Sequence, residues 1–146
     1  MVGQLYRAEN CLDYKPSKLA EYPVLKVKLY NMMLEQYPEE LEIPVDTGFE
    51  GSLMLTAVDY EFFKVGELPQ THWRTYRTLA GTVVMRVARA IAEINGHQLE
   101  IYVETPQLGI GKRLMGRELL NKLILILDGP AKKCCTAISL KHLHER

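Results

Sequence analysis

Cysteine is scarce in this chain and does not form a framework. The sequence of 146 residues has three cysteines, Cys11, Cys134 and Cys135, an odd number of which two are adjacent. No Cys-x-x-Cys pair occurs, so neither a set of disulfides nor the usual spacing of a zinc site is indicated. We therefore expect free thiols in a reducing cytoplasm.

Excess charge and long apolar runs are lacking as well. Lysine plus arginine and aspartate plus glutamate number 18 each, so the formal net charge is zero, whereas nucleic-acid-binding proteins usually carry a basic excess. No stretch approaches the roughly 20 apolar residues of a membrane span. Gln4, Arg7 and Glu9 interrupt any apolar signal core at the amino terminus. No nucleic-acid or membrane partner is expected, and a charge near zero is compatible with self-association.

What is present indicates one globular domain of mostly β structure. The length and the 47% of hydrophobic residues suffice for one core. Asn95-Gly96 between two alternating runs predicts a hairpin, because both central residues of a type I′ turn need positive φ. Thr56 is suited to cap a short helix that runs to about Lys64, and a second short helix is expected after Gly116. The predicted strands cover residues 24–30, 41–45, 52–55, 75–94 with a break at 78–82, 98–104, a buried run at 123–127, and 138–140.

One stretch joins an apolar strand to a small polar turn. Residues 41–45 (Leu-Glu-Ile-Pro-Val) lead into Asp46-Thr47-Gly48, and a second apolar strand follows. Pro44 offers no ladder donor, which favours an edge or irregular strand. An isolated Asp-Thr-Gly arises by chance in a chain of this length on the order of a few per cent of the time, so support from elsewhere in the chain is needed.

A second motif far downstream supplies that support. Residues 114–120 read Leu-Met-Gly-Arg-Glu-Leu-Leu, and a β-rich stretch at 75–104 separates them from the Asp-Thr-Gly. In this order of parts the chain resembles the retropepsin family, the retroviral type of aspartic protease, over roughly residues 24–128. The resemblance implies a mostly β acid-protease barrel with one or two short helices. We divide the chain into an N-terminal arm (1–22), a retropepsin-like domain (23–130) and a C-terminal strand with a polar tail (131–146).

The resemblance implies a homodimeric aspartic endopeptidase. Such hydrolysis needs two carboxylates that share one proton around a water, because like charges about 3 Å apart do not both ionise. The chain has one Asp-Thr-Gly, so the second catalytic Asp46 is expected from another copy across a twofold axis. By resemblance, Thr47 hydrogen-bonds across that axis and Gly48 presents a carbonyl to the substrate. The alternatives are a turn aspartate, a buried strand threonine and an ordinary turn glycine. The expected partners are a second copy and a peptide or protein substrate.

The loop and the downstream helix carry further candidates. Glu50 and Arg117 are expected to form an ion pair between loop and helix, with a solvated arginine as the alternative. Phe49 stands where many relatives have a small or hydroxyl-bearing residue, which predicts a less acidic activity optimum and a narrower substrate cleft. Leu114 and Met115 either line a pocket or pack in the core.

The flap is the part in which the chain departs most from the family. Retroviral flaps are rich in glycine, whereas here only Gly81 serves, and we place the tip at Leu79, Ala80 and Gly81. Trp73 and Tyr76 contact either the substrate or the core and dimer interface.

No cofactor and no metal are expected. His142 and His144 have a spacing that suits a metal, but a polar tail is the preferred interpretation. The rival to an enzyme is a non-catalytic module that keeps the dimeric fold for assembly or peptide binding. The intact Asp46-Thr47-Gly48 favours the enzyme.

Overall fold

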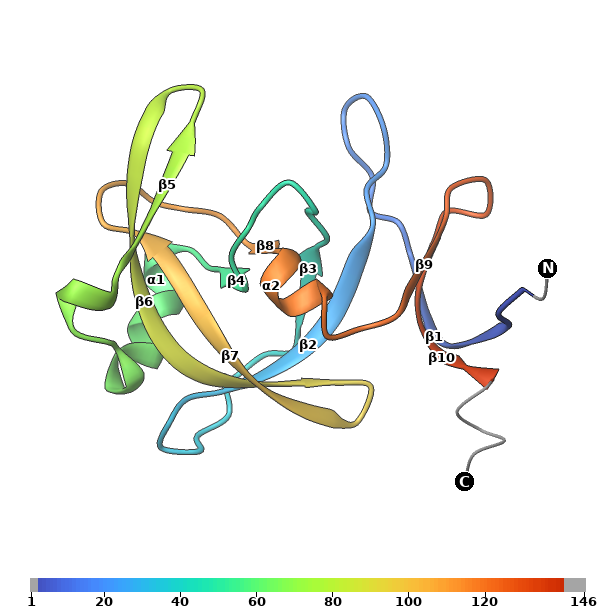
Figure 1. Cartoon of the computed structure of the whole chain (residues 1–146), viewed down its shortest axis with the longest axis horizontal. Coiled ribbons are helices and arrows are strands. Elements are labelled where there is room, and N and C mark those ends of the chain that lie inside the picture. The colour runs from blue at the N-terminus through green and yellow to red at the C-terminus, as the bar shows by residue number, and fades with distance from the viewer. Residues whose placement is uncertain (1–2, 141–146) are drawn as a thin grey trace.

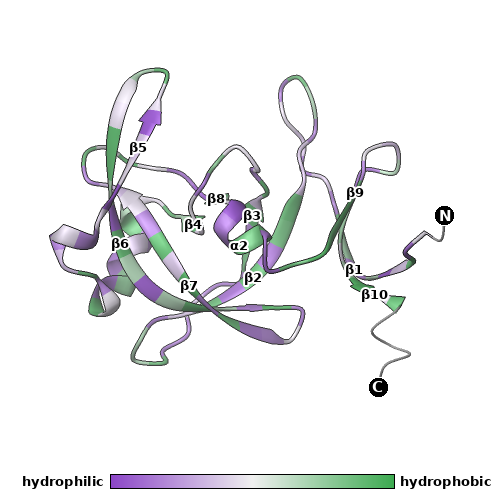
Figure 2. Cartoon of the chain, in the orientation of Figure 1, coloured by the Kyte–Doolittle hydropathy of each residue, from purple (hydrophilic) through white to green (hydrophobic). Residues whose placement is uncertain are grey.

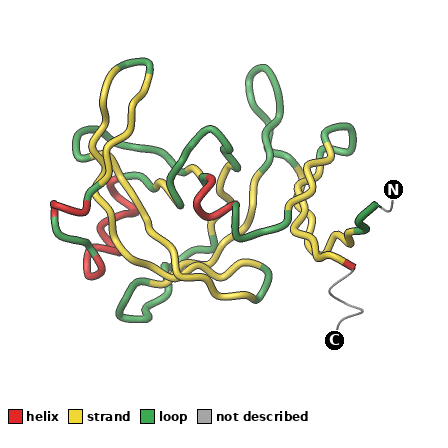
Figure 3. The backbone as a smooth tube through the Cα atoms, in the orientation of Figure 1, coloured by secondary structure: helices red, strands yellow, loops and turns green. Residues whose placement is uncertain are grey.

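The computed structural model describes residues 3–140, and these consist mainly of strands in two sheets (Figure 1). The helical segments are short, as the red parts of Figure 3 show. They are α1 (Ala57–Tyr60), the 3₁₀ segments η1 (Glu61–Gly66) and η2 (Gln70–His72), and α2 (Arg117–Leu120). The prediction of a mostly β chain with short helices is confirmed. His142 and His144 lie outside the described residues.

The larger sheet has the strand order β3-β2-β6-β7-β4-β8, and β5 pairs with residues 81–85 at the start of β6. Pro44 lies in the edge strand β3 opposite Val24, where its missing N–H breaks no ladder. The hairpin between β6 and β7 turns at Asn95 and Gly96, which have φ values of 52° and 78°, as predicted. The strands are β2 (Val24–Tyr30), β3 (Leu41–Pro44), β4 (Leu53–Met54), β5 (Arg74–Thr78), β6 (Gly81–Ile94), β7 (His97–Pro106) and β8 (Leu114–Met115).

The core lies between the curved larger sheet and the helical segment after β4. Polar and apolar residues alternate along the long strands, as Figure 2 shows. Val27 and Leu29 of β2 are fully buried in this core, together with Tyr60 and Phe63 of the helical segment. The Thr56 hydroxyl accepts a hydrogen bond from the Asp59 backbone N–H at 3.2 Å, so the predicted helix cap is present.

The smaller sheet has the order β1-β10-β9 and stands at one end of the molecule, beside both ends of the described chain (Figure 1). Its strands are β1 (Tyr6–Asp13), β9 (Leu125–Asp128) and β10 (Lys133–Ser139). The predicted buried strand at 123–127 is wrong in its burial, because β9 is an edge strand of this small sheet and Leu127 is 50% exposed. The predicted last strand is longer than expected, since it pairs along the N-terminal arm.

The cysteines correct a second expectation. Cys11 and Cys135 form a disulfide, and burial raises the pKa of the remaining Cys134 thiol to about 11. The prediction of free thiols is therefore wrong for two of the three cysteines. The two bonded residues are 124 positions apart and become neighbours only because β1 pairs with β10. The disulfide removes the cysteine argument for a reducing cytoplasm, so the cytoplasmic location stays a prediction.

Candidate active site

Asp46 lies just beyond the end of β3, where its backbone is held on two sides. Its N–H donates to the Met115 carbonyl at 2.9 Å, and its carbonyl accepts from the Phe49 N–H at 3.1 Å. The carboxylate Oδ1 accepts from the Gly48 N–H at 2.9 Å. The side chain is half-buried, whereas Thr47 and Gly48 are exposed. The loop therefore presents one oriented carboxylate at the protein surface.

The two sequence motifs meet directly behind this carboxylate. The Gly116 N–H donates to the Ser52 carbonyl at 2.9 Å, and the Arg117 N–H donates to the Phe49 carbonyl at 2.8 Å. A Cβ on Gly116 would lie 2.2 Å from the Gly51 carbonyl oxygen, so only glycine permits this approach. The start of α2 thus supports the loop that carries Asp46.

A cavity of about 680 Å³ opens beside Asp46, between its loop and the β5–β6 hairpin. Apolar side chains form much of its wall, and two cationic side chains, Arg77 and Lys112, also face it. A cleft with an apolar wall and several polar groups is typical of ligand-binding sites. The lining residues are Asp46, Gly48, Phe49, Glu50, Met54, Thr75, Tyr76, Arg77, Thr78, Val83, Met85, Pro106, Gly111, Lys112 and Leu114.

The hairpin turn coincides with the predicted flap tip. Leu79 and Ala80 form the turn between the paired residues Thr78 and Gly81. Gly81 has a φ of 117°, which explains why a single glycine serves here. The Thr78 hydroxyl accepts from the Ala80 N–H at 3.2 Å and donates to the Gly81 carbonyl at 2.9 Å. The Leu79 side chain is fully exposed, and the three tip residues lie outside the cavity lining.

The remaining candidates separate into wall, core and surface. Phe49 is 9% exposed and packs against Tyr76, with ring centroids 5.6 Å apart, so both rings help to close the inner side of the cavity. Leu114 lines the cavity, but Met115 is fully buried and packs in the core. Trp73 is half-buried, and its indole N–H donates to the Leu68 carbonyl.

The Glu50–Arg117 pair is present but open to solvent. The Arg117 Nη2 lies 3.5 Å from the Glu50 Oε1, and the two side chains are 50% and 71% exposed. Exposed pairs of this kind are worth about 0–1 kcal/mol. The Arg117 backbone N–H, rather than its guanidinium, gives the closer contact with the loop.

A buried carboxylate that the sequence did not indicate lies behind the loop. Glu104 is fully buried and accepts hydrogen bonds from the Tyr76 hydroxyl at 2.7 Å and from the Ser52 N–H at 3.2 Å. The Arg74 guanidinium lies 3.2 Å away. Burial raises the pKa of Glu104 above its ordinary value, against the opposing influence of the Tyr76 hydrogen bond, the Arg74 charge and the Ser52 N–H. Strand alternation gives no sign of this site, because it assigns Glu104 to the same face as the exposed Glu100.

A second missed cluster holds the segment that leads into β8. Arg113 donates to both carboxylate oxygens of Asp59, at 2.8 and 3.0 Å, and the Tyr37 hydroxyl donates to Asp59 at 2.6 Å. Burial alone raises the pKa of Asp59, but the hydrogen bonds from Arg113, Tyr37 and the Thr56 cap outweigh it and lower the pKa to about 2. The cluster fixes α1 to the residue that precedes Leu114, which lines the cleft.

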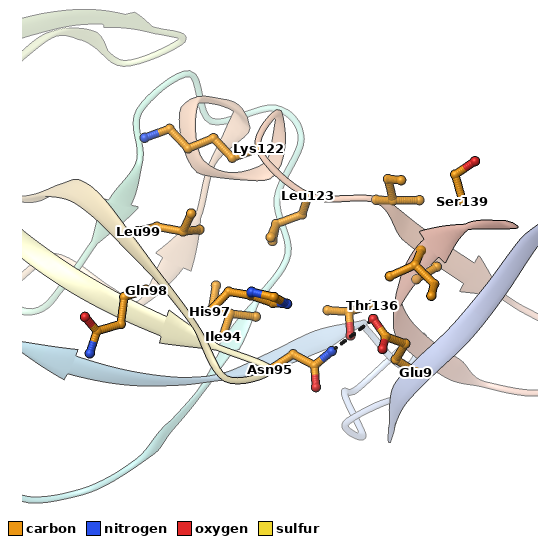
Figure 4. A pocket seen from close by; sticks show the side chains of 13 residues that line it. Glu9, Ile94, Asn95, His97, Gln98, Leu99, Lys122, Leu123, Thr136 and Ser139 are labelled. Carbon is orange, nitrogen blue, oxygen red and sulfur yellow. Dashed lines mark hydrogen bonds between the residues drawn. The ribbon is translucent and has the colours of Figure 1, made fainter. Parts of the chain in front are cut away.

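A second cavity, of about 480 Å³, lies away from Asp46, between the β6–β7 hairpin and the small sheet (Figure 4). Asn95 reaches across it to Glu9 at 3.5 Å. Within residues 3–140, no group of three or more histidine, cysteine, aspartate or glutamate side chains is arranged to hold a metal ion. In the same part of the chain, no helix has the length and apolar character to cross a membrane.

Comparisons with known proteins give limited further information. No family model matches the chain, and no curated protein matches it. Among solved structures, EIAV protease complexed with the inhibitor HBY-793 is similar over 74% of this chain and 93% of that one, with a TM-score of 0.47 and 17% sequence identity. The sequence motifs and the geometry of the cleft therefore remain the basis for a functional assignment.

Proposed function

We propose that this chain is a retropepsin-like aspartic endopeptidase that acts as a homodimer. The observation that carries the proposal is the half-buried Asp46 of an Asp-Thr-Gly loop, held by the Met115 carbonyl and the Gly48 N–H at the mouth of a cleft. A hairpin with a two-residue turn forms the opposite wall of that cleft.

The catalytic unit is a pair of Asp46 carboxylates, one from each copy. The pair holds one proton and titrates as a unit. The ionised carboxylate takes a proton from a water between the two, while the neutral carboxylate donates to the carbonyl oxygen of the peptide. The tetrahedral intermediate collapses as the amine leaving group is protonated.

Four features support a second copy. The sequence has one Asp-Thr-Gly. Glu50, the other carboxylate that lines the cleft, forms an exposed ion pair with Arg117 at 3.5 Å. Thr47 is exposed beside Asp46, where it could hydrogen-bond across a twofold axis. Leu79 at the hairpin turn exposes an apolar side chain that a substrate or a second copy would cover.

An extended peptide suits the cleft. Strand β5, which pairs with β6 on one side, offers the backbone groups of its other edge to an extended chain. The apolar wall formed by Phe49, Met54 and Leu114 would receive alternate side chains of that chain. Movement of the β5–β6 hairpin would admit the peptide and then exclude water.

The direct test is cleavage of an unfolded protein by the full chain. The wild type is expected to cleave it, Asp46→Asn to abolish cleavage, and a hydroxyl-bearing peptide analogue of the tetrahedral intermediate to inhibit it. Asp128→Asn, at the last residue of β9, is the matched control and should retain activity. Cleavage that survives in Asp46→Asn would reject the catalytic role of Asp46.

Mixing tests the dimer separately. If each active unit needs two copies of Asp46, an equal mixture of wild-type and Asp46→Asn chains leaves about one quarter of the dimers active. Activity per wild-type chain would then fall to about half. An unchanged activity per wild-type chain would contradict a shared site.

The rival function is a non-catalytic module that binds peptides or assembles with itself. It predicts binding of an unfolded peptide and a dimer, but no cleavage by the wild type at any pH from 3 to 8. The intact, oriented Asp46 carboxylate favours the enzyme.

A further inference from the structure

A fully buried carboxylate lies behind the proposed catalytic loop, near the end of β7. Glu104 is 0% exposed, although the mechanism does not use it. Its Oε1 accepts from the Tyr76 hydroxyl at 2.7 Å, and its Oε2 faces the Ser52 N–H and the Arg74 Nη1, both at 3.2 Å. Buried carboxyl groups are found where they are hydrogen-bonded and paired, and Glu104 meets both conditions.

The hydrogen-bond partners of Glu104 come from two separate parts of the fold, and one of them reaches a third part. Arg74 and Tyr76 belong to β5, the strand that begins the hairpin, whereas Ser52 belongs to the end of the catalytic loop. Arg74 also makes a two-pronged contact with Glu118 of α2, at 3.0 and 2.9 Å. One carboxylate and one guanidinium therefore join the hairpin, the loop and the supporting helix.

The cluster packs directly on the catalytic loop. A Cβ on Gly51 would lie 2.2 Å from the Glu104 Oε2 and 2.8 Å from the Tyr76 hydroxyl oxygen. The Phe49 ring lies against the ring of Tyr76, and both line the cleft. A shift of Glu104 or Tyr76 would therefore reach the loop three to six residues from Asp46.

Stability alone is a weak explanation for such a cluster. Well-packed apolar residues often replace a buried ion pair without loss of stability, whereas geometry is set more strictly by charged hydrogen bonds. The contacts also lie together at the base of the hairpin. A small rotation of the hairpin about its base displaces the turn at Leu79 more than any other part of it.

We propose that Glu104 is a positioning residue. Through Arg74 and Tyr76 it holds the base of the β5–β6 hairpin against the catalytic loop, and this attachment sets the position of the hairpin relative to Asp46. This inference rests on the proposed function in assigning the hairpin a role in substrate binding. The structural part, a hairpin held by Glu104, stands independently of catalysis.

The test compares Glu104→Gln with Glu100→Gln in the full chain. Glu100 lies on the same strand and also pairs with an arginine of a neighbouring strand, Arg89 at 2.8 Å, but this pair is exposed. The glutamine at 104 keeps an acceptor for the Tyr76 hydroxyl and turns an amide toward Arg74 and the Ser52 N–H, which are donors themselves. Hydrogen exchange of the backbone amides at 74–85 should become about tenfold faster, as expected for losing a charge-assisted hydrogen bond, while Glu100→Gln leaves it unchanged.

A second readout uses a quenched fluorescent peptide that the wild type cleaves. Loosening the hairpin should raise KM about tenfold and change kcat less, because the closed form becomes less populated before chemistry begins. Tyr76→Phe, which keeps the ring and removes the hydroxyl, should act in the same direction, and the double variant should show less than the sum of the two effects. If Glu104→Gln fails to fold, Tyr76→Phe carries the same comparison.

The outcomes separate the inference from the proposed function. Unchanged hairpin exchange in Glu104→Gln and Tyr76→Phe overturns the inference, whether or not the wild type cleaves peptides. Faster hairpin exchange with an unchanged KM overturns the link to substrate. Faster hairpin exchange in the two variants, together with a wild type that never cleaves, supports the hairpin attachment and rejects the endopeptidase.

Discussion

Replacing Asp59 by asparagine is expected to destabilise the protein at neutral pH and to matter progressively less as the pH falls. The Asp59 side chain is 5% exposed and accepts hydrogen bonds from Arg113 and Tyr37. These bonds favour the ionised carboxylate more than burial opposes it, which lowers the pKa from 3.8 to about 2. A carboxyl whose pKa is lower in the folded state contributes stability above its unfolded pKa and loses it as the pH falls toward the folded pKa.

The magnitude follows from the two pKa values. A difference of one unit in pKa corresponds to about 1.4 kcal/mol. A fall in the pKa of Asp59 from 3.8 to about 2 therefore stabilises the folded state by roughly 2 kcal/mol at pH 7. At pH 3, between the two values, roughly half of this contribution remains. Asparagine resembles the protonated carboxyl, so the variant and the wild type should converge below about pH 2.

Urea unfolding at pH 7, 5, 4 and 3 measures this difference. The protein concentration is held fixed, because the proposed dimerisation would make the stability depend on concentration. Glu61→Gln is the control, since Glu61 is 58% exposed and pairs with Lys64 on the neighbouring turn. Its effect should stay within about 0.5 kcal/mol at every pH. An Asp59→Asn deficit that is independent of pH would refute the role assigned to the ionised carboxylate.

Three further predictions concern the loop and the disulfide. Gly116→Ala places a Cβ 2.2 Å from the Gly51 carbonyl oxygen, so it should lower the free energy of unfolding in urea by about 1–3 kcal/mol and also lower the activity. Gly129→Ala, which has open space around it, should change neither quantity. Cys11→Ser should lower the unfolding free energy by about 2–4 kcal/mol, and this difference should vanish when the wild type is reduced. Phe49→Ser should move the acid limb of the pH–activity profile to lower pH, and an unmoved limb would contradict the proposed influence on the Asp46 pair.

Features that depend on neighbours in sequence were predictable. Asn95-Gly96 requires positive φ at both positions, and the hairpin turns there. Pro44 cannot donate to a ladder, and its strand lies at a sheet edge. The Thr56 hydroxyl caps the helix that follows it. In each case the chemistry of one or two residues restricts the backbone locally, so no knowledge of distant contacts is needed.

Features that depend on distant partners were not predictable. Pairing of β1 with β10 brings Cys11 and Cys135 together, which no spacing rule indicates. The run at 123–127 is apolar enough for a core strand, yet β9 lies at the edge of the small sheet with Leu127 half exposed. Composition records how apolar a strand is, but the sheet that it joins decides whether it is covered.

Taken alone, the sequence determined the hairpin at Asn95-Gly96, the Asp46-Thr47-Gly48 loop and the glycine-containing motif around Gly116, because these depend on local residue chemistry and order. Tertiary structure decided which side chains surround the loop. Alternation assigns Glu100 and Glu104 to one face of β7, but the first is exposed and the second fully buried. The difference arises because β5 and the loop after Asp46 cover only one end of that face, and which segments fold over a strand is a property of the whole chain.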